Sequence, residues 1–557
     1  MTPNLHLTRL TGTQEQMGAQ HGAFAPVAAR KLFAFYRTMP ERALAGDVSA
    51  LQRFVVRQVA TAWQASLART RPAELSARTR AFVAAAAPDA SAREKKLIAL
   101  TMATMDSMQN CVSLAARAQL GPFANPITAR TAAAAIPACS TAIAWGSATV
   151  DGELMFARNF DFPGVGIWDD AAAFTLCAPT TGQRYGFFGA RGADAPVVTV
   201  VNEAGLVIAP HTRWHRDVTW SGAMIVDLVH ELARRAETLD DAIKIARETP
   251  ASSSWGIAIG SAREKSALVL ELGGPHVEIV RPTGPRRRNE TLTCTNRYRS
   301  DGMQHGQLAA SHAWAHHSDH REQRLRGLVE GRTAPLTLPE LLGFLGDREL
   351  AGARRHFGSI LAQPTNVHAV AISPATRHAL VGIDRAPCCE GTVADLGWTW
   401  EGPSGDWDLA KHEGSGFAAR AVDIVAPHDP ATLHVREAVR VFEQVHDVAA
   451  ARTSLDRAIA AAPEDPSLQL AAAWLAVEDR AHDRAISHVR AGLALEADPY
   501  RRGQLFACGA RAATTAAERT RWLAELDRHH CDGVEELRRR ARRKAPLKTN
   551  LLMADAF

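Results

Sequence analysis

Residues 139–146 read CSTAIAWG, and residues 158–161 read RNFD. The first stretch alternates like a β-strand, and the Asp151-Gly152 pair between the two stretches is a strong hairpin-turn signal. We expect one strand over residues 140–150 and a second over residues 154–161. The hairpin would return the arginine and the aspartate of the second stretch to the side of the cysteine. A thiol, a cation and a carboxylate would then meet in space.

The composition of the chain is that of an ordinary soluble globular protein. Of its 557 residues, 46% are hydrophobic and 22% charged, and a chain of this length is expected to form roughly two to four domains. The net charge of +5 is too small and too dispersed to favour binding to nucleic acid or to a membrane surface.

The sequence contains no export or membrane signal. Residues 1–21 are polar and have no apolar core of a signal peptide, and no stretch approaches the ~18 consecutive apolar residues of a membrane span. The cysteines show no CxxC spacing, and the neighbours Cys388 and Cys389 suit neither an ordinary disulfide nor a metal clamp. We therefore expect a cytoplasmic protein whose cysteines act as thiols.

Three regions of different pattern follow one another. Residues 1–138 and 426–557 carry apolar side chains at helical spacing, and the last part of the first region, 121–138, predicts a loose connector. Residues 139–425 contain short β-branched runs separated by Gly, Pro or Asn. Two helical patterns interrupt these runs, over residues 223–249 and 321–345. The sequence therefore predicts an α+β domain of layered antiparallel strands between two helical regions.

The C-terminal region shows a weak repeat. Asp465-Pro466 and Asp498-Pro499 lie 33 residues apart, with alanines at close-packing positions between them. This resembles tetratricopeptide-type helix pairs, whose period is about 34 residues. An irregular helical appendage fits the same pattern, and a protein partner on these helices is a further possibility.

A cysteine nucleophile needs a base to take its proton. The usual base is a histidine, but autocleavage before the nucleophile provides another, its own α-amine, whose pKa near 8 suits this work. The second solution requires a preceding segment, a cleavable bond and a strand that begins with the nucleophile. Residues 1–138, the Ala138-Cys139 bond and the following strand supply all three.

Six segments stand in the order of a known family. They are Gly18-Ala19-Gln20-His21-Gly22, Cys139-Ser140-Thr141, Arg158-Asn159-Phe160-Asp161, Asn202-Glu203-Ala204-Gly205-Leu206, Thr295-Asn296-Arg297-Tyr298 and the Ser318, Arg321, Arg324, Leu325 pattern. Together they resemble the N-terminal-nucleophile (Ntn) hydrolases, in the penicillin acyltransferase-like branch related to choloylglycine hydrolases and acid ceramidase. The resemblance covers about residues 5–410 and implies a four-layer αββα sandwich.

The resemblance also implies roles for single residues. Cys139 would be the nucleophile, and its freed amine the base. Asp161 would orient that amine, Arg158 would lower the thiol pKa, and Asn296 would donate to the oxyanion. Arg321 would be a structural or substrate-facing cation.

Three positions depart from the family pattern. His211-Thr212 stands where family members often have an Asn, so His211 is a candidate oxyanion donor through its ring N–H. Arg297 replaces the usual His after the second Asn of the pattern. Ala138 replaces a Gly before the nucleophile.

The sequence thus predicts a self-processing cysteine amidohydrolase or acyltransferase that acts on an N-acyl amide of a small molecule or peptide, without a cofactor. Hydrolysis and acyl transfer stay open, as do the substrate and the oligomeric state. The rivals are an inactive scaffold that binds a partner through its C-terminal helices, and an unprocessed cysteine hydrolase with His211 as base.

Two further groups of residues have a functional and an ordinary interpretation. His312, His316, His317 and His320 stand close together, the first, second and last at four-residue spacing, and could ligate zinc on a helix, but their polar surroundings favour a surface loop. Five aromatic residues could line an apolar acyl pocket, although core packing is their commoner role. These are Trp145, Phe160, Phe162, Trp168 and Trp214.

Overall fold

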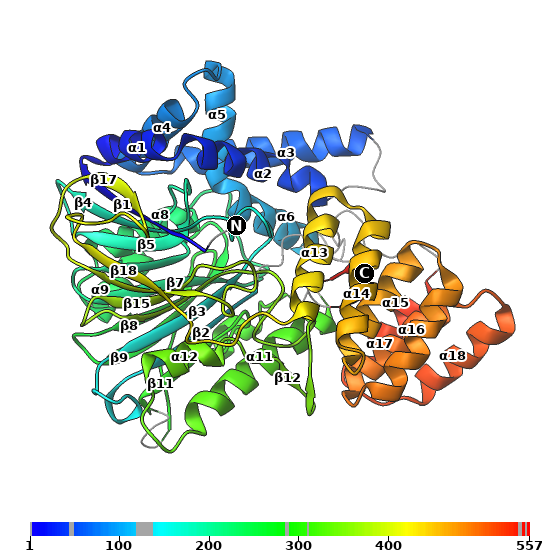
Figure 1. Cartoon of the computed structure of the whole chain (residues 1–557). Helices are drawn as coiled ribbons and strands as arrows, with labels where there is room; N and C mark the ends of the chain where they lie inside the picture. The colour runs from blue at the N-terminus through cyan, green and yellow to red at the C-terminus, as the bar shows by residue number, and fades with distance from the viewer. Residues whose placement is uncertain are drawn as a thin grey trace.

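The computed structural model describes residues 3–43, 50–117, 138–284, 289–308, 311–543, 549–551 and 554–556. Two large β-sheets form its centre, with the N-terminal helices above them and the C-terminal helices at one side (Figure 1). The fold is therefore α+β, as the sequence predicts. Among the described residues, no helix combines the length and the apolar character needed to cross a membrane. The predicted connector over residues 121–138 lies outside the described residues, except for Ala138.

The larger sheet has nine strands in the order β10-β9-β8-β7-β6-β5-β4-β1-β17. They span Leu5–Gly12 (β1), Ala172–Pro179 (β4), Tyr185–Ala190 (β5), Thr199–Asn202 (β6), Leu206–Thr212 (β7), Ser254–Ser261 (β8), Ser266–Gly273 (β9), His276–Val280 (β10) and Gly405–Asp408 (β17). The helical pattern of the N-terminal region misses β1, which lies inside this sheet. Strand β1 also runs parallel to β4, whereas only antiparallel strands were expected. Its apolar side chains Leu5, Leu7 and Leu10 are fully buried.

The smaller sheet has seven strands in the order β11-β2-β3-β14-β15-β16-β18. They span Ala138–Ala144 (β2), Met155–Asp161 (β3), Thr291–Cys294 (β11), Asn366–Ser373 (β14), His378–Gly382 (β15), Val393–Trp398 (β16) and Phe417–Val422 (β18). Two short two-stranded ladders complete the described strands, Glu349–Leu350 (β12) with Ala353–Arg354 (β13) and Thr549–Asn550 (β19) with Asp555–Ala556 (β20).

The β2–β3 hairpin is shorter on its first side than the sequence predicts. Strand β2 ends at Ala144 and not at Val150, because Gly146 has a φ of +61° and opens a 3₁₀ turn over Gly146–Ala148. A positive φ suits glycine and ends the extended backbone there. The second strand begins within one residue of the expected position.

The two sheets pack face to face and each carries helices on its outer side. Ile143, Phe156 and Val370 of the smaller sheet share one core with Phe174 and Val201 of the larger sheet. Helices α8 (Ile225–Arg235) and α9 (Leu239–Glu248) cover the larger sheet, and α11 (His312–Glu330) and α12 (Leu338–Phe344) cover the smaller one. The order of layers is therefore helix, sheet, sheet, helix.

Each of the two internal helical patterns divides into two helices. The pattern over residues 223–249 breaks where Thr238 caps α9 through a capping box with Asp241. The pattern over residues 321–345 belongs to α11, which begins nine residues earlier at His312, and to α12, whose N-terminal cap is Thr337. A short helix over Asp301–Gln304 (α10) precedes them.

The N-terminal helices lie across one end of the sandwich (Figure 1). They span Gln14–Phe24 (α1), Pro26–Ala43 (α2), Ala50–Arg69 (α3), Ala73–Ala86 (α4), Ala92–Leu100 (α5) and Thr104–Arg117 (α6). Ser91-Ala92-Arg93-Glu94 has the spacing of a capping box, and Ser91 and Glu94 form one at the start of α5. A buried charged cluster ties these helices to the larger sheet, because Arg78 of α4 donates to Asp194 and His21 of α1 contacts the same carboxylate at 2.9 Å.

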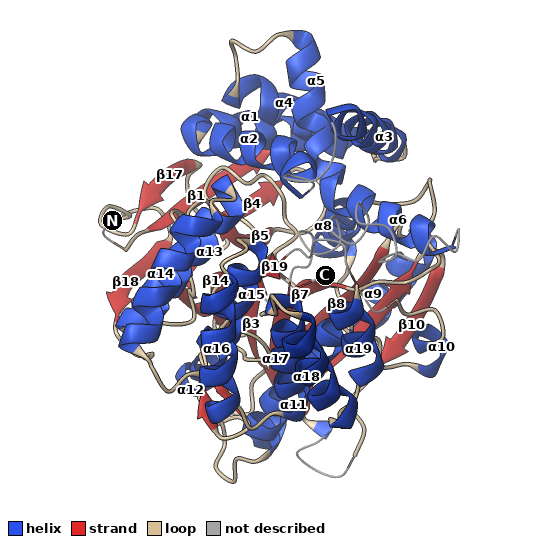
Figure 2. Ribbon diagram, turned by 90° about the vertical axis from the view of Figure 1, so that its right-hand side faces the viewer, coloured by secondary structure: helices blue, strands red, loops and turns tan. Residues whose placement is uncertain are grey.

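The C-terminal helices form one layered group beside the sheets (Figure 2). They span Pro430–Val445 (α13), Val448–Ala461 (α14), Pro466–Glu478 (α15), His482–Leu495 (α16), Pro499–Ala512 (α17), Ala516–Arg528 (α18) and Val534–Arg542 (α19). Asp465 and Asp498, the two repeat positions, each cap a helix that starts with proline, and Asp429 does the same for α13. The repeat in the sequence thus marks helix starts; its tetratricopeptide character stays a prediction.

Buried charges join these helices to the part of the chain that forms the sheets. Arg355, in the loop before β14, donates two hydrogen bonds of 2.6 Å to Glu496, and both side chains are almost fully buried. Arg436 of α13 likewise binds the buried Asp169 at 2.8 Å. The C-terminal helices are therefore packed onto the sheets and not merely tethered to them.

Replacing Glu496 by Gln should destabilise this junction strongly. The change leaves the Arg355 guanidinium buried beside a neutral amide, and breaking a buried ion pair costs about 3–5 kcal/mol. We expect a matching drop in the urea midpoint of the C-terminal region. Asp456→Asn, which breaks the exposed pair with Arg484, is the control and should cost under about 1 kcal/mol. Equal losses for the two variants would contradict this role of the buried pair.

Candidate active site

Cys139 is the second residue of β2, at the end of the sandwich that the N-terminal helices cover. In the β2–β3 ladder it pairs with Phe160, and Ala138 pairs with Asp161. Side chains alternate along strands, so Cys139 shares a face with Ile143, which packs between the two sheets. The hairpin therefore brings the thiol next to the Arg158 and Asp161 end of β3, as the sequence predicts.

Three side chains contact Cys139 directly. The Arg158 Nη2 atom lies 3.3 Å from the Cys139 Sγ. The backbone N–H of Cys139 donates to Asn296 Oδ1 at 3.0 Å, and the Cys139 carbonyl accepts from Arg321 Nη1 at 2.9 Å. All four residues are at most 1% exposed. The nucleophile candidate is thus held on its thiol, its nitrogen and its carbonyl oxygen at once.

Burial controls the acidity of the thiol. It raises the Cys139 pKa, and the opposing effect of the Arg158 cation does not cancel it. The expectation that Arg158 lowers the thiol pKa therefore describes only one of the two effects. The same guanidinium also donates to the Pro210 carbonyl, while its Nε and Nη1 make no hydrogen bond among the described residues.

Asp161 is a buried carboxylate with one free oxygen. Its Oδ1 accepts from Asn366 Nδ2 at 3.1 Å, whereas its Oδ2 has no hydrogen-bond partner in the described part of the chain. Burial raises the pKa of Asp161 to about 7, against the smaller opposing effects of Arg321, Asn366 and Arg158. Asn366 was not a candidate in the sequence, because nothing in the pattern pairs the start of β14 with the end of β3.

Asn296 connects Cys139 to the opposite sheet. Its Oδ1 accepts from Cys139 and from Arg321 Nη2 at 2.8 Å, and its Nδ2 donates to the Thr212 carbonyl at 3.0 Å. One N–H of the amide expected to serve an oxyanion is therefore engaged with Thr212. Arg321 contacts protein atoms on every side, including Ser140 Oγ and the His317 carbonyl.

His211 lies between the sheets and not on the cavity described below. Its Nε2 is 2.9 Å from Thr141 Oγ1, and its Nδ1 has no partner among the described residues. Burial, with Arg158 and two further arginines adding to it, holds the His211 pKa well below its usual value. The imidazole is therefore neutral at ordinary pH.

An apolar cavity of about 130 Å³ adjoins Cys139. Its walls come from both sheets and from the N-terminal helices, with Tyr36 of α2, Phe82 of α4 and Met105 of α6 facing Val198 and Trp255. Of the five aromatic residues singled out in the sequence, Phe160, Phe162 and Trp168 line this cavity, and Trp145 and Trp214 do not. The N-terminal segment thus supplies one side of the space next to the thiol.

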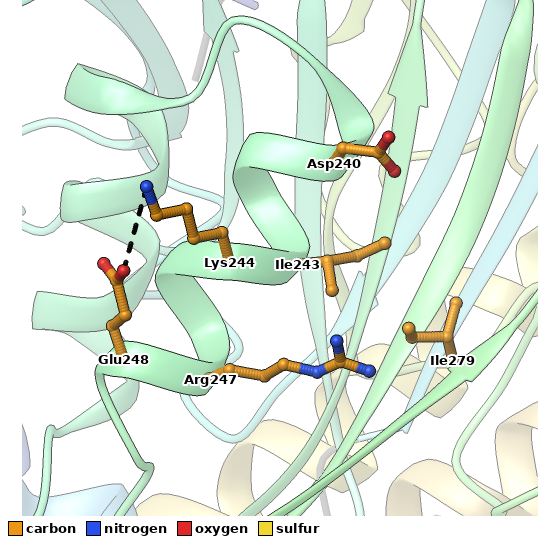
Figure 3. A pocket seen from close by; sticks show the side chains of 6 residues that line it. All are labelled: Asp240, Ile243, Lys244, Arg247, Glu248 and Ile279. Carbon is orange, nitrogen blue, oxygen red and sulfur yellow. Dashed lines mark ion pairs between the residues drawn. The ribbon is translucent and has the colours of Figure 1, made fainter.

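A second depression lies on the outer surface between α9 and β10 (Figure 3). Its lining is charged and includes Lys244 and Glu248, which form an ion pair across one helical turn at 4.0 Å. None of the predicted site residues lines it. Its open, ionic character is that of a solvated helix face.

The histidine cluster lies in helix α11 and not in a surface loop, because Ser311 caps a helix that begins at His312. The ring of His316 is 2.7 Å from Ser359 Oγ and 3.3 Å from Asp498 Oδ2, and His320 packs against it. His316, His320 and Asp498 offer ligand atoms within 4.8 Å of one another. Arg501 also donates to Ser359 at 2.8 Å. The hydrogen bonds of His316 with Ser359 and Asp498 therefore help to join α11 to the C-terminal helices.

The structure is thus a sandwich of two sheets covered by helices, with a buried thiol beside an apolar cavity. Residues 148–350 match the model of the family described as Acyl-coenzyme A:6-aminopenicillanic acid acyl-transferase. The family resemblance that the sequence motifs predict is thereby confirmed over this stretch. It begins nine residues after Cys139 and contains Arg158, Asp161, His211, Asn296 and Arg321.

Comparison with solved structures finds the Caenorhabditis elegans N-acylethanolamine-hydrolyzing acid amidase (NAAA) ortholog. It is 13% identical, with 42% of this chain and 93% of that chain covered and a TM-score of 0.31. Nothing about the present chain is inferred from a sequence identity and a TM-score this low. No match was found among curated protein sequences.

Asp161→Asn should change how stability depends on pH. Because the fold raises the Asp161 pKa from 3.8 to about 7, the ionised carboxylate is disfavoured in the folded state, and the wild type loses stability as pH rises between these values. The uncharged asparagine does not titrate. The melting temperature of the variant relative to wild type should therefore rise from pH 4 to pH 7 and level off above. A difference that stays constant across this range would refute the raised pKa.

Proposed function

We propose that the protein is a self-processing cysteine amidohydrolase or acyltransferase of the Ntn-hydrolase type, with Cys139 as its nucleophile. The observation that carries the proposal is the arrangement around Cys139, where Arg158, Asn296 and Arg321 hold a buried thiol at the edge of an apolar cavity. The family match over residues 148–350 supports the reaction class.

The proposed reaction has two stages. In the first, Cys139 Sγ attacks the Ala138 carbonyl and forms a thioester, while the peptide C–N bond breaks and the Cys139 nitrogen takes up a proton and leaves as the free amine. Water then hydrolyses this thioester, which frees the thiol and leaves a carboxylate on Ala138. In the second, this amine takes the thiol proton while Sγ attacks the amide carbonyl of a substrate. A C–S bond forms, the C–N bond breaks, and the proton leaves with the amine product. Water or a second amine then releases the acyl group from the thioester.

Two features of the site favour the freed amine over His211 as the base. The Cys139 nitrogen already lies against Asn296 Oδ1, which would orient an amine at the same place, and the free Oδ2 of Asp161 stands on the neighbouring strand. The His211 ring, by contrast, is paired with Thr141, does not line the cavity, and has a lowered pKa.

The cavity favours a substrate with an apolar acyl group. Its lining is dominated by Leu, Phe, Met, Val and Trp side chains, and a cavity of about 150 Å³ is known to hold a benzene ring. The space of about 130 Å³ therefore fits an aromatic ring or a short alkyl chain on the acyl side. The leaving amine would extend out of the cavity.

Cys139→Ala should abolish both self-cleavage and amide turnover, because no other thiol lines the cavity among the described residues. Intact-mass measurement should find one 60.1 kDa chain, where the wild type gives a fragment that begins at Cys139. Release of the amine from N-acyl amides with phenylacetyl or short alkyl groups measures turnover. Cys508→Ala, in helix α17, is the control and should behave as wild type.

Cleavage or turnover by the Cys139→Ala variant would refute the proposal. A wild-type chain that stays uncut and does not react with acylating thiol probes would favour the scaffold interpretation instead.

The two fragments of the cleaved wild type should stay together in size-exclusion chromatography without denaturant. Strand β1 of the first fragment lies between β4 and β17 of the second, hydrogen-bonded to both. Separation of the fragments under native conditions would contradict this strand order.

A further inference from the structure

The cavity beside Cys139 offers very few polar side-chain groups that are free to bind a substrate. Among its lining residues, Thr101 donates its hydroxyl to the Ile98 carbonyl at 2.6 Å, and Asp194 is saturated by Arg78 and His21. The Tyr36 hydroxyl lies within hydrogen-bonding range of the Trp168 side chain, whereas the Thr212 hydroxyl makes no hydrogen bond within the described part of the chain. A buried amide group of a substrate needs hydrogen-bond partners, and the Thr212 hydroxyl is the side-chain hydroxyl of the cavity wall that is available to it.

Thr212 and Cys139 line the same cavity, and the Asn296 side chain joins their backbones. The Thr212 carbonyl accepts from Asn296 Nδ2 at 3.0 Å, and Oδ1 of the same carboxamide accepts from the Cys139 nitrogen at 3.0 Å. Two residues earlier on β7, the Pro210 carbonyl and the Cys139 Sγ share one donor, Arg158 Nη2. The Asn296 side chain thus joins the backbone of β7 to the backbone of Cys139, and the Arg158 side chain joins the backbone of β7 to the Cys139 thiol.

Tyr36 occupies a different part of the cavity wall. It comes from α2, and its ring packs against Phe162 and Trp168 at centroid distances of 6.1 and 6.3 Å. Among the described residues, its hydroxyl makes no hydrogen bond to Cys139, Asn296 or Arg158. Its place is among the aromatic side chains that would surround the acyl group.

We propose that the Thr212 hydroxyl donates a hydrogen bond to the carbonyl oxygen of the substrate amide, and that this bond strengthens when Cys139 attacks. The proposal rests on the proposed function. As the C–S bond forms, the carbonyl π electrons move to oxygen, and the hydroxyl stabilises the negative charge without giving up its proton. A fixed donor aimed at developing charge in a water-poor site is an effective way to lower the barrier.

The other candidate donors are engaged elsewhere. The Asn296 amide donates one N–H to the Thr212 carbonyl and does not line the cavity, and the His211 ring is paired with Thr141 and absent from the cavity wall. Thr212 is therefore a catalytic residue by contact with the substrate, the role expected of His211 or Asn296 from the sequence.

Thr212→Val tests the proposal, since valine keeps the shape of threonine and removes only the hydroxyl. With the amide substrates named above, we expect kcat to fall by about 10²-fold, as for other single oxyanion donors, with a small change in KM. Thr212→Ser, which retains the hydroxyl, should stay near wild type. Thr199→Val is the matched control, because Thr199 is a buried threonine of the same sheet whose hydroxyl makes no hydrogen bond among the described residues and which does not line the cavity.

Intact mass and melting temperature are measured for every variant. If Thr212→Val and Thr212→Ala both stay uncut while Thr212→Ser is cut, the hydroxyl is needed for attack by Cys139 on the Ala138 carbonyl, which supports the same donor role. A Thr212→Val protein that is cut and turns over within about threefold of wild type would overturn the inference. That result would leave the proposed function intact, since only the Cys139→Ala experiment decides it.

Discussion

One carboxamide holds the site together. The Asn296 side chain accepts from the Cys139 nitrogen and donates to the Thr212 carbonyl, so it joins β2 of the smaller sheet to β7 of the larger one. Two sheets that share only apolar contacts can slide by small amounts, whereas a buried amide with both ends engaged fixes their separation, because breaking either bond leaves a buried polar group unpaired. Arg321 reinforces this bond from α11, with one nitrogen on Asn296 and another on the Cys139 carbonyl. The position of the thiol relative to the cavity depends on these few hydrogen bonds.

The N-terminal segment is a structural part of the sandwich and of the site. Strand β1 lies inside the nine-stranded sheet, and Tyr36, Phe82 and Met105 form one wall of the cavity. The buried cluster of Arg78, Asp194 and His21 fixes this wall against the sheet. A cut before Cys139 would therefore change the chain end at the thiol without removing the wall, since the contacts that hold the helices do not run through the cut bond.

Local patterns in the sequence predict local structure well here, and long-range contacts poorly. The Asp151-Gly152 turn predicts the hairpin that pairs Cys139 with Phe160. The Asp-Pro pairs, noted in the sequence only as a repeat, lie at the starts of α15 and α17. The motif order predicts the family that the match over residues 148–350 bears out.

The features that the sequence did not predict depend on contacts between segments that lie far apart in the chain. Strand β1 was missed because eight residues between polar ends give little periodicity to read. Asn366 and Thr212 were missed as site residues because their importance comes from the groups they face, Asp161 and the cavity. The histidines of α11 were placed in a surface loop since their polarity hid the helix and its burial under the C-terminal helices.

The raised pKa of Cys139 gives the strongest physical reason to link cleavage to activity. A thiol buried beside an apolar cavity stays protonated near neutral pH, and one guanidinium does not reverse this. Nucleophilic attack therefore needs a base within reach of Sγ. His211 is paired with Thr141, and Asp161 is tied to Asn366 with its own pKa raised. In the uncut chain the nitrogen of Cys139 itself is an amide, which is not basic. Cleavage would turn this same atom into an amine, so the proposed site gains its base at the bond that it breaks.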